Sequence, residues 1–119
     1  MTQCKAAKNW LGLALGSLLM GGILSLLLIM ERVPFVNRLI EDPLFAEKGL
    51  VIHVNLTLGA WNFAFFTALF LMIPGGSRGK MNLVVAILGI VIICVSGFMP
   101  GAEPILSNYF PVLDHPLFF

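Results

Sequence analysis

One histidine, His53, lies near the start of a long uncharged stretch that covers residues 49–72. At a helical rise of ~1.5 Å per residue, this stretch is long enough to cross the hydrocarbon core of a bilayer. An ionisable side chain inside such a span is costly, so it faces protein, a cavity or a cofactor rather than lipid. Such an imidazole can be an axial ligand of a haem held between helices. It can also be a neutral hydrogen-bonding group against a neighbouring helix, and the residue alone leaves both readings open.

The two faces of this expected helix carry different side chains. With about 100° between successive residues, His53 shares one stripe with small residues: Thr57, Ala60, Ala64 and Ala68. Small side chains let a neighbouring helix or a flat ligand come close. The opposite stripe holds Asn55, Gly59 and Asn62, and we expect the two asparagines to hydrogen-bond to other helices. Both faces therefore predict contacts with partners.

The composition is that of a membrane protein. The 119 residues are 59% hydrophobic and 11% charged, and the mean hydropathy is +0.98, far above the soluble norm. The net charge of +1 is too small for a nucleic-acid surface, so we expect membrane lipid around the chain and no nucleic acid. Cys4 and Cys94 are expected at different depths of the membrane, without a disulfide.

The hydrophobic pattern predicts an all-α membrane protein with one membrane domain, 1–119. The expected transmembrane helices are three, at about 10–30, 49–72 and 81–99. The first is expected to be retained, because no small-residue cleavage site follows it. It contains a G-x-x-x-G pair, Gly12 and Gly16, that would allow a second helix to approach closely. Four prolines prevent a regular helix in the tail, 100–119.

The basic residues set the expected orientation. Two segments carry basic residues and no acid, namely the N-terminus and the turn at 73–80, which contains Arg78 and Lys80. The other two flanks hold all the carboxylates. By the positive-inside rule, the N-terminus and this turn are cytoplasmic and the Pro-rich tail lies on the outer side. His53 would then lie about one helical turn below the outer face.

Two segments resemble a known family. LFAEKGLVIHVNLTLGAWNFAFF, at 44–66, resembles the second membrane helix of subunit I of haem–copper terminal oxidases, the cytochrome c oxidase catalytic subunit. In its divergent bacterial subunit I-like members, a VVHVxLSxLxW stretch opens that helix. GAEPILSNYFPVLDHPLFF, at 101–119, resembles the outer loop between helices three and four. The resemblance covers most of the chain from about residue 42 onward.

The resemblance implies a specific role for His53. In that family the helix-two histidine is an axial ligand to the iron of the low-spin haem, near the outer side. The family's other ligands, including three copper-binding histidines, lie on later helices among about twelve. This chain covers three, and His115 in the tail matches no ligand position. The resemblance thus implies a haem shared with another chain and copper only on that partner. The second axial ligand stays open, and neither Met20 nor Met30 is excluded.

The resemblance implies a subunit or split N-terminal fragment of a terminal oxidase core subunit. It would serve electron transfer to oxygen in the respiratory chain, in a bacterial or mitochondrial inner membrane. Its partners would be other oxidase subunits, including a chain with the remaining core helices. The chain carries no complete active site, so it would be part of an oxidoreductase complex. The alternative is a non-catalytic accessory subunit of a respiratory complex that binds no haem. A small channel subunit is a third class, weakened because no span is broken.

Overall fold

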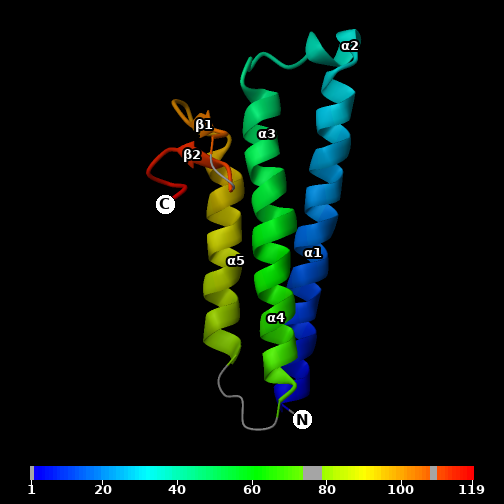
Figure 1. Cartoon of the computed structure of the whole chain (residues 1–119), viewed down its shortest axis with the longest axis vertical. Coiled ribbons are helices and arrows are strands. Elements are labelled where there is room, and N and C mark those ends of the chain that lie inside the picture. Colours follow the sequence, from blue (N-terminus) through cyan, green and yellow to red (C-terminus); the bar gives the residue numbers. More distant parts are fainter. Residues whose placement is uncertain (1, 74–78, 108–109) are drawn as a thin grey trace.

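The computed structural model describes residues 2–73, 79–107 and 110–119, and long helices dominate it (Figure 1). A π-helical segment, η1 (Asn55–Ala60), joins helix α3 (Phe45–Val54) to helix α4 (Trp61–Leu71). The elements in chain order are α1 (Thr2–Glu31), α2 (Pro34–Asn37), α3 (Phe45–Val54), η1 (Asn55–Ala60), α4 (Trp61–Leu71), α5 (Gly79–Ser96), β1 (Glu103–Ile105) and β2 (Val112–Asp114).

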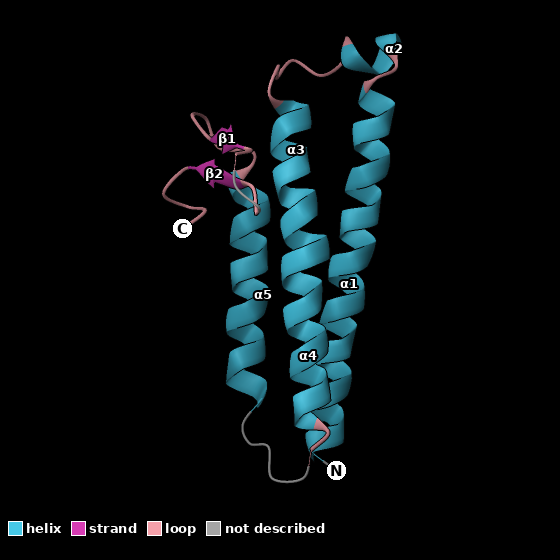
Figure 2. Ribbon diagram, in the orientation of Figure 1, coloured by secondary structure: helices cyan, strands magenta, loops and turns pink. Residues whose placement is uncertain are grey.

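Segments α3, η1 and α4 form one continuous helical rod, which lies beside α1 (Figure 2). The helix begins at Phe45, four residues before the expected residue 49, so its first turn includes the charged residues Glu47 and Lys48. His53 consequently lies eight residues into the rod, at ~12 Å from its start, or about two turns. Gly49 is buried, and a Cβ atom there would lie 2.8 Å from Leu28 Cδ2 of α1. The missing side chain therefore lets α1 and α3 approach each other.

Two helical segments are long and apolar enough to cross a membrane, Gln3–Glu31 and Phe45–Leu71. The expectation of a third full-length span at 81–99 is wrong for the residues that the structure describes. There the apolar helix is shorter, Asn82–Ser96, and its length of ~22 Å falls below the ~30 Å of bilayer hydrocarbon. Helix α5 ends at Ser96, whose Oγ donates to the carbonyl oxygen of Ile93 at 2.6 Å.

The buried cluster sits where α1 packs against α4. Its members come from both helices and are mostly alanines: Ala7, Trp10, Ala14, Ala64, Ala68 and Leu71. Ala14 and Ala64 are 0% and 1% exposed, respectively. Since alanines face each other here, the helices come close without a large apolar core. Most other large apolar side chains of the helices are exposed, including Phe63 at 77%.

The tail is not purely irregular, so the all-α expectation is wrong in this segment. Strands β1 and β2 pair antiparallel, with Pro104 opposite Leu113. Gly101 turns the chain with φ of 81°, a conformation that favours glycine. Leu113 is fully buried, and both strands contact α3. The prolines do exclude a helix here, as predicted, but one short ladder still forms.

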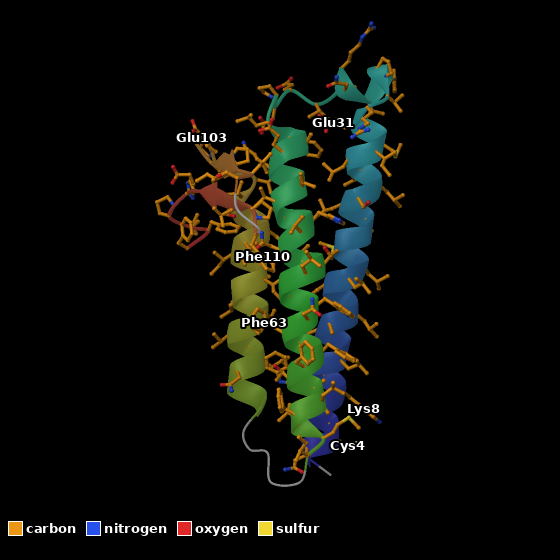
Figure 3. All side chains as sticks on the ribbon, viewed as in Figure 1. Cys4, Lys8, Glu31, Phe63, Glu103 and Phe110 are labelled. Atoms are coloured by element: carbon orange, nitrogen blue, oxygen red, sulfur yellow. The ribbon has the colours of Figure 1, made fainter. Side chains whose placement is uncertain are left out.

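Charges divide between the two ends of the helical bundle. Lys8 lies at one end, and Glu31 and Glu103 lie at the other (Figure 3). All acidic side chains of the sequence lie at the end with Glu31: Glu31, Glu41, Asp42, Glu47, Glu103 and Asp114. The predicted basic pair, Arg78 and Lys80, lies outside the described side chains.

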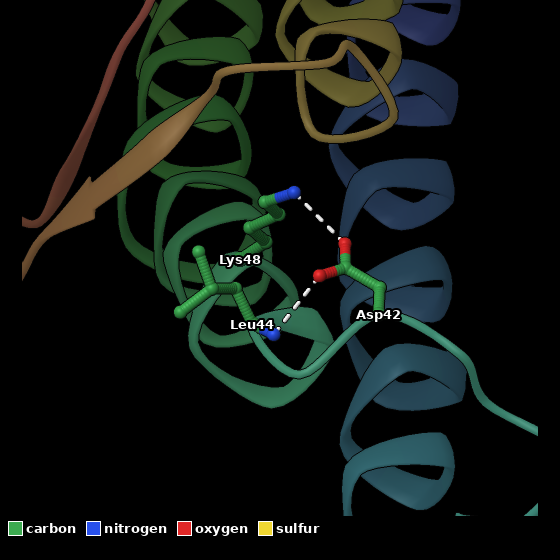
Figure 4. A network of polar contacts seen from close by, with 3 residues as sticks. All are labelled: Asp42, Leu44 and Lys48. Carbon is green, nitrogen blue, oxygen red and sulfur yellow. Dashed lines mark hydrogen bonds and ion pairs between the residues drawn. The ribbon is translucent and has the colours of Figure 1, made fainter.

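The start of α3 is fixed by one carboxylate. Asp42 Oδ1 accepts a hydrogen bond from the Leu44 backbone N–H at 2.9 Å, and its Oδ2 accepts one from Lys48 Nζ at 2.8 Å (Figure 4). The Lys48 ammonium, and then the Leu44 N–H, lower the pKa of the Asp42 carboxyl below its ordinary value. Asp42 thus joins the polar connection to the first turn of the helix.

Candidate functional site

His53 lies at the end of α3 and is half-buried against α1. Its Nδ1 lies 2.7 Å from the backbone carbonyl oxygen of Gly21. A carbonyl oxygen only accepts hydrogen bonds, so Nδ1 carries the proton and donates. In the neutral ring, the lone pair is then on Nε2. Histidines that bind metals commonly have this arrangement, with the second ring nitrogen donating to a carbonyl or carboxylate.

Gly21 is where α1 comes closest to this site. A Cβ atom at Gly21 would collide with the Thr57 methyl carbon and would lie 3.8 Å from His53 Nδ1. A side chain at this position would force the Thr57 side chain to move. Close approach was predicted at Gly12 and Gly16, but a Cβ atom at either meets nothing within 4 Å. The role expected of that glycine pair is therefore taken by Gly21.

The small-residue stripe beyond His53 packs against a helix. Ala64 and Ala68 are buried against the first half of α1, and Thr57 contacts Gly21 further along. We predicted either a helix or a flat ligand on this face. Along α4 the face is covered by helix α1. A flat ligand on this rod would have to approach the ring of His53 itself.

The π-helix begins two residues after His53. Within it, the side chains of Asn55 and Thr57 each donate 2.8 Å bonds to carbonyls four residues earlier, those of Val51 and His53. Such bonds compete with the regular ladder and bend helices, and Gly59 adds a weak helix former. Single π turns inside α-helices are frequent at functional sites. The π turn was not predicted, although Asn, Thr and Gly at alternate positions are its visible signal.

The opposite stripe, which contains Asn55 and Asn62, does not make the contacts with other helices that we predicted. Asn55 Nδ2 also donates to the Pro111 carbonyl oxygen at 2.8 Å, so its partner is the tail rather than a helix. Asn62 Nδ2 donates to the Leu58 carbonyl oxygen of its own helix at 2.7 Å. The prediction that both asparagines bond to other helices is therefore wrong among the described residues. Asn55 instead fixes the tail beside α3.

The described residues provide one candidate haem ligand rather than a complete ligand set. No group of three His, Cys, Asp or Glu side chains able to hold a metal ion occurs among them. His115 follows β2, and its Nδ1 accepts a hydrogen bond from the Leu117 N–H at 3.2 Å. Met20 and Met30 on α1 are 51% and 52% exposed. His53 fits an axial ligand by its fixed ring and its Nε2 lone pair.

Two cavities flank the start of α3, and His53 lines neither. The larger, about 340 Å³, has Glu31, Arg32 and Glu47 among its lining residues. The smaller, about 160 Å³, lies between α1, the first turns of α3 and the segment after α5. Leu28 contributes to both, so its side chain lies between them.

Comparison with known proteins gives one distant relative. An uncharacterized protein of Aquifex aeolicus (strain VF5) is 29% identical over 110 residues, which cover 92% of this chain and 28% of the relative. The chain thus spans little more than a quarter of that relative's length. No family model matches the chain, and no solved structure matches it.

Proposed function

We propose that this chain is a subunit or N-terminal segment of a haem–copper terminal oxidase core and supplies His53 as one axial ligand to a low-spin haem. A low-spin haem, when bound, passes single electrons onward. The remaining core helices, the second axial ligand and the copper ligands would belong to a partner chain or to a continuation of the same chain. The length of the Aquifex relative, mostly outside the match, is compatible with such a continuation.

One observation carries the haem proposal, the hydrogen bond from His53 Nδ1 to the Gly21 carbonyl oxygen. It orients the imidazole on the rod, fixes the tautomer and leaves Nε2 as the donor that iron requires. The Thr57 hydroxyl bonds to the carbonyl of His53 itself. Two polar groups thus contact the backbone and the ring of one residue.

A membrane location is part of the proposal. Only 17% and 22% of the residues in the two candidate spans are buried within the chain, whereas core helices of soluble proteins are mostly buried. The exposed apolar side chains would be costly in water. We place the chain in a bacterial or mitochondrial inner membrane, with the carboxylate-rich end outside and the N-terminus in the cytoplasm.

The competing function is an accessory subunit of a respiratory complex that binds no haem. The same bond supports it, because the Gly21 carbonyl alone satisfies a histidine that serves as interhelical glue. The two functions differ at Nε2. Iron binds this atom in the first case, whereas protein or water contacts it in the second.

Reduced-minus-oxidised absorption spectra of the complex, purified with the full chain in mild detergent, test the proposal. We expect a low-spin haem signal that His53→Ala abolishes and that the matched control His115→Ala leaves intact. His53→Gly with added free imidazole addresses misfolding, since imidazole should restore the low-spin signal. A complex without haem, or a signal that survives in His53→Ala, would refute haem ligation by His53 and favour the accessory function instead.

A further inference from the structure

The smaller cavity has walls from three separate parts of the chain. Leu24 and Leu28 come from α1, Ile52 comes from α3, and Phe98 follows α5. A volume of about 160 Å³ could hold roughly five waters at ~30 Å³ each, but a buried water needs two to four polar partners. The leucine, isoleucine and phenylalanine walls offer none, and the charged groups of the lining are Asp42 and Lys48. Space that is lined by Leu, Ile and Phe side chains stays dry and accepts apolar molecules.

Two glycines shape the cavity. Gly49 and Gly97 both line it, and a side chain at Gly97 would collide with the Cδ1 atom of Ile52. The cavity also meets exposed apolar surface, since Leu27 is 44% exposed and Phe98 is 80% exposed. An apolar chain could therefore enter from the side of the bundle that lipid would cover.

The polar part of the lining is the ion pair of Asp42 and Lys48 (Figure 4). The Lys48 side chain is 12% exposed and that of Asp42 is 43% exposed. An ammonium has three N–H donors, of which Asp42 takes one, and each carboxylate oxygen can accept a second bond. This pair can thus receive an anion at Lys48 and a cation at Asp42 together.

The geometry points to a binding site for a zwitterionic phospholipid of the ethanolamine type, with the first part of one acyl chain in the cavity between α1 and α3. Its phosphate would accept from Lys48, and its ammonium would donate to Asp42. Asp42 precedes the candidate span Phe45–Leu71, and Lys48 lies in its first turn. The pair therefore lies at the depth of the lipid headgroups. A lipid with net negative charge would match only Lys48 and would meet the Asp42 carboxylate. This inference rests on a membrane location but not on haem binding.

Native mass spectrometry of the delipidated full chain tests this site. Phosphatidylethanolamine and phosphatidylglycerol with identical acyl chains would be titrated separately in mild detergent. We expect one tightly held phosphatidylethanolamine, at least fivefold favoured over phosphatidylglycerol. Leu27→Trp should fill the cavity and lower that affinity at least fivefold. The matched control is Leu26→Trp, since Leu26 is 63% exposed and lines neither cavity.

Two further measurements make the result decisive. Asp42→Asn should remove the preference for the ethanolamine headgroup while a lipid still binds, and circular dichroism should show unchanged helix content in each variant. A diazirine within the first few carbons of the acyl chain should label Ile52 and Phe98, which line the cavity, more than the exposed Phe63. Equal binding of both lipids, equal effects of the two tryptophan variants, or uniform labelling would overturn the proposal.

Discussion

His53 Nδ1 and the Gly21 carbonyl oxygen lie 2.7 Å apart and join two helices whose residues are 32 positions apart in the chain. The contact exists because Gly21 has no side chain and because Thr57, one turn after His53, fills the adjoining space. Three residues on two helices thus set the position of the imidazole. The same three residues make the site open to test by substitution.

Gly21→Ala should destabilise the folded chain by about 1–3 kcal/mol, because its methyl group would collide with that of Thr57. Thr57→Ser keeps the hydroxyl that donates to the His53 carbonyl and removes the colliding methyl. The double variant should recover roughly 1 kcal/mol or more of coupling energy. Denaturant unfolding in micelles, followed by circular dichroism, measures the free energy of unfolding of the parent chain, the two single variants and the double variant, which together form a double-mutant cycle. Purely additive effects would contradict the contact.

Asn55→Ala should loosen the tail, since it removes the side-chain bond to the Pro111 carbonyl oxygen. A hydrogen bond of this kind is worth about 0.5–1.5 kcal/mol. Hydrogen exchange at the β2 backbone should therefore accelerate by roughly two- to tenfold. Asn62→Ala is the control, because Asn62 bonds to its own helix. Equal acceleration in both variants would show that the tail does not depend on Asn55.

Ala64→Leu should cost about 1–3 kcal/mol of folding stability, because Ala64 is 1% exposed against the alanines of α1. Phe63→Leu, one residue earlier and 77% exposed, should change the stability of the isolated chain by no more than about 0.5 kcal/mol. Thermal unfolding of both variants in the same detergent checks this difference. If Phe63→Leu were the more damaging change, the assignment of faces would be wrong.

Asp42 should titrate below its ordinary value of 3.8. Because the folded pKa is lowered, its stabilising contacts are complete above the ordinary value and are lost as the pH falls below about 4. A carbon NMR titration of the Asp42 carboxyl in micelles reports this pKa directly. Lys48→Met should raise it, since the Lys48 bond is the largest cause of the shift, and Arg38→Met is a suitable control. An unchanged pKa in Lys48→Met would refute the ion pair.

The apolar runs were enough to predict the long helices. The second predicted span, 49–72, overlaps almost all of Phe45–Leu71, because an uncharged run of that length has few other structures available. The first predicted span ended within one residue of Glu31, where the charged connection begins. The stripe of small residues that includes His53 was predicted to allow a close helix contact, and Ala64 and Ala68 do pack against α1.

Other features depend on geometry that a single sequence does not encode. The choice of Gly21 over Gly12 and Gly16 depends on how far α1 is shifted along α3. The π turn depends on side chains that bond back to their own helix, and such residues occur in many regular helices. The pairing of β1 with β2 joins residues seven to eleven positions apart, with Glu103 opposite Asp114 as the widest pair, across a proline-rich segment with little strand character. The haem ligand role of His53 stays a prediction.

The contacts of α5 bear on the order in which the protein is assembled. Among the described helices, α1 packs along α3, η1 and α4, whereas α5 makes its main helix contact with α1. The first two long segments of the chain can therefore form a packed hairpin before α5 leaves the ribosome. Helix α5 and the two strands are synthesised after this hairpin, and the strands contact α3. The end that bears Asp42 and Glu103 therefore needs the chain through β2 to be complete.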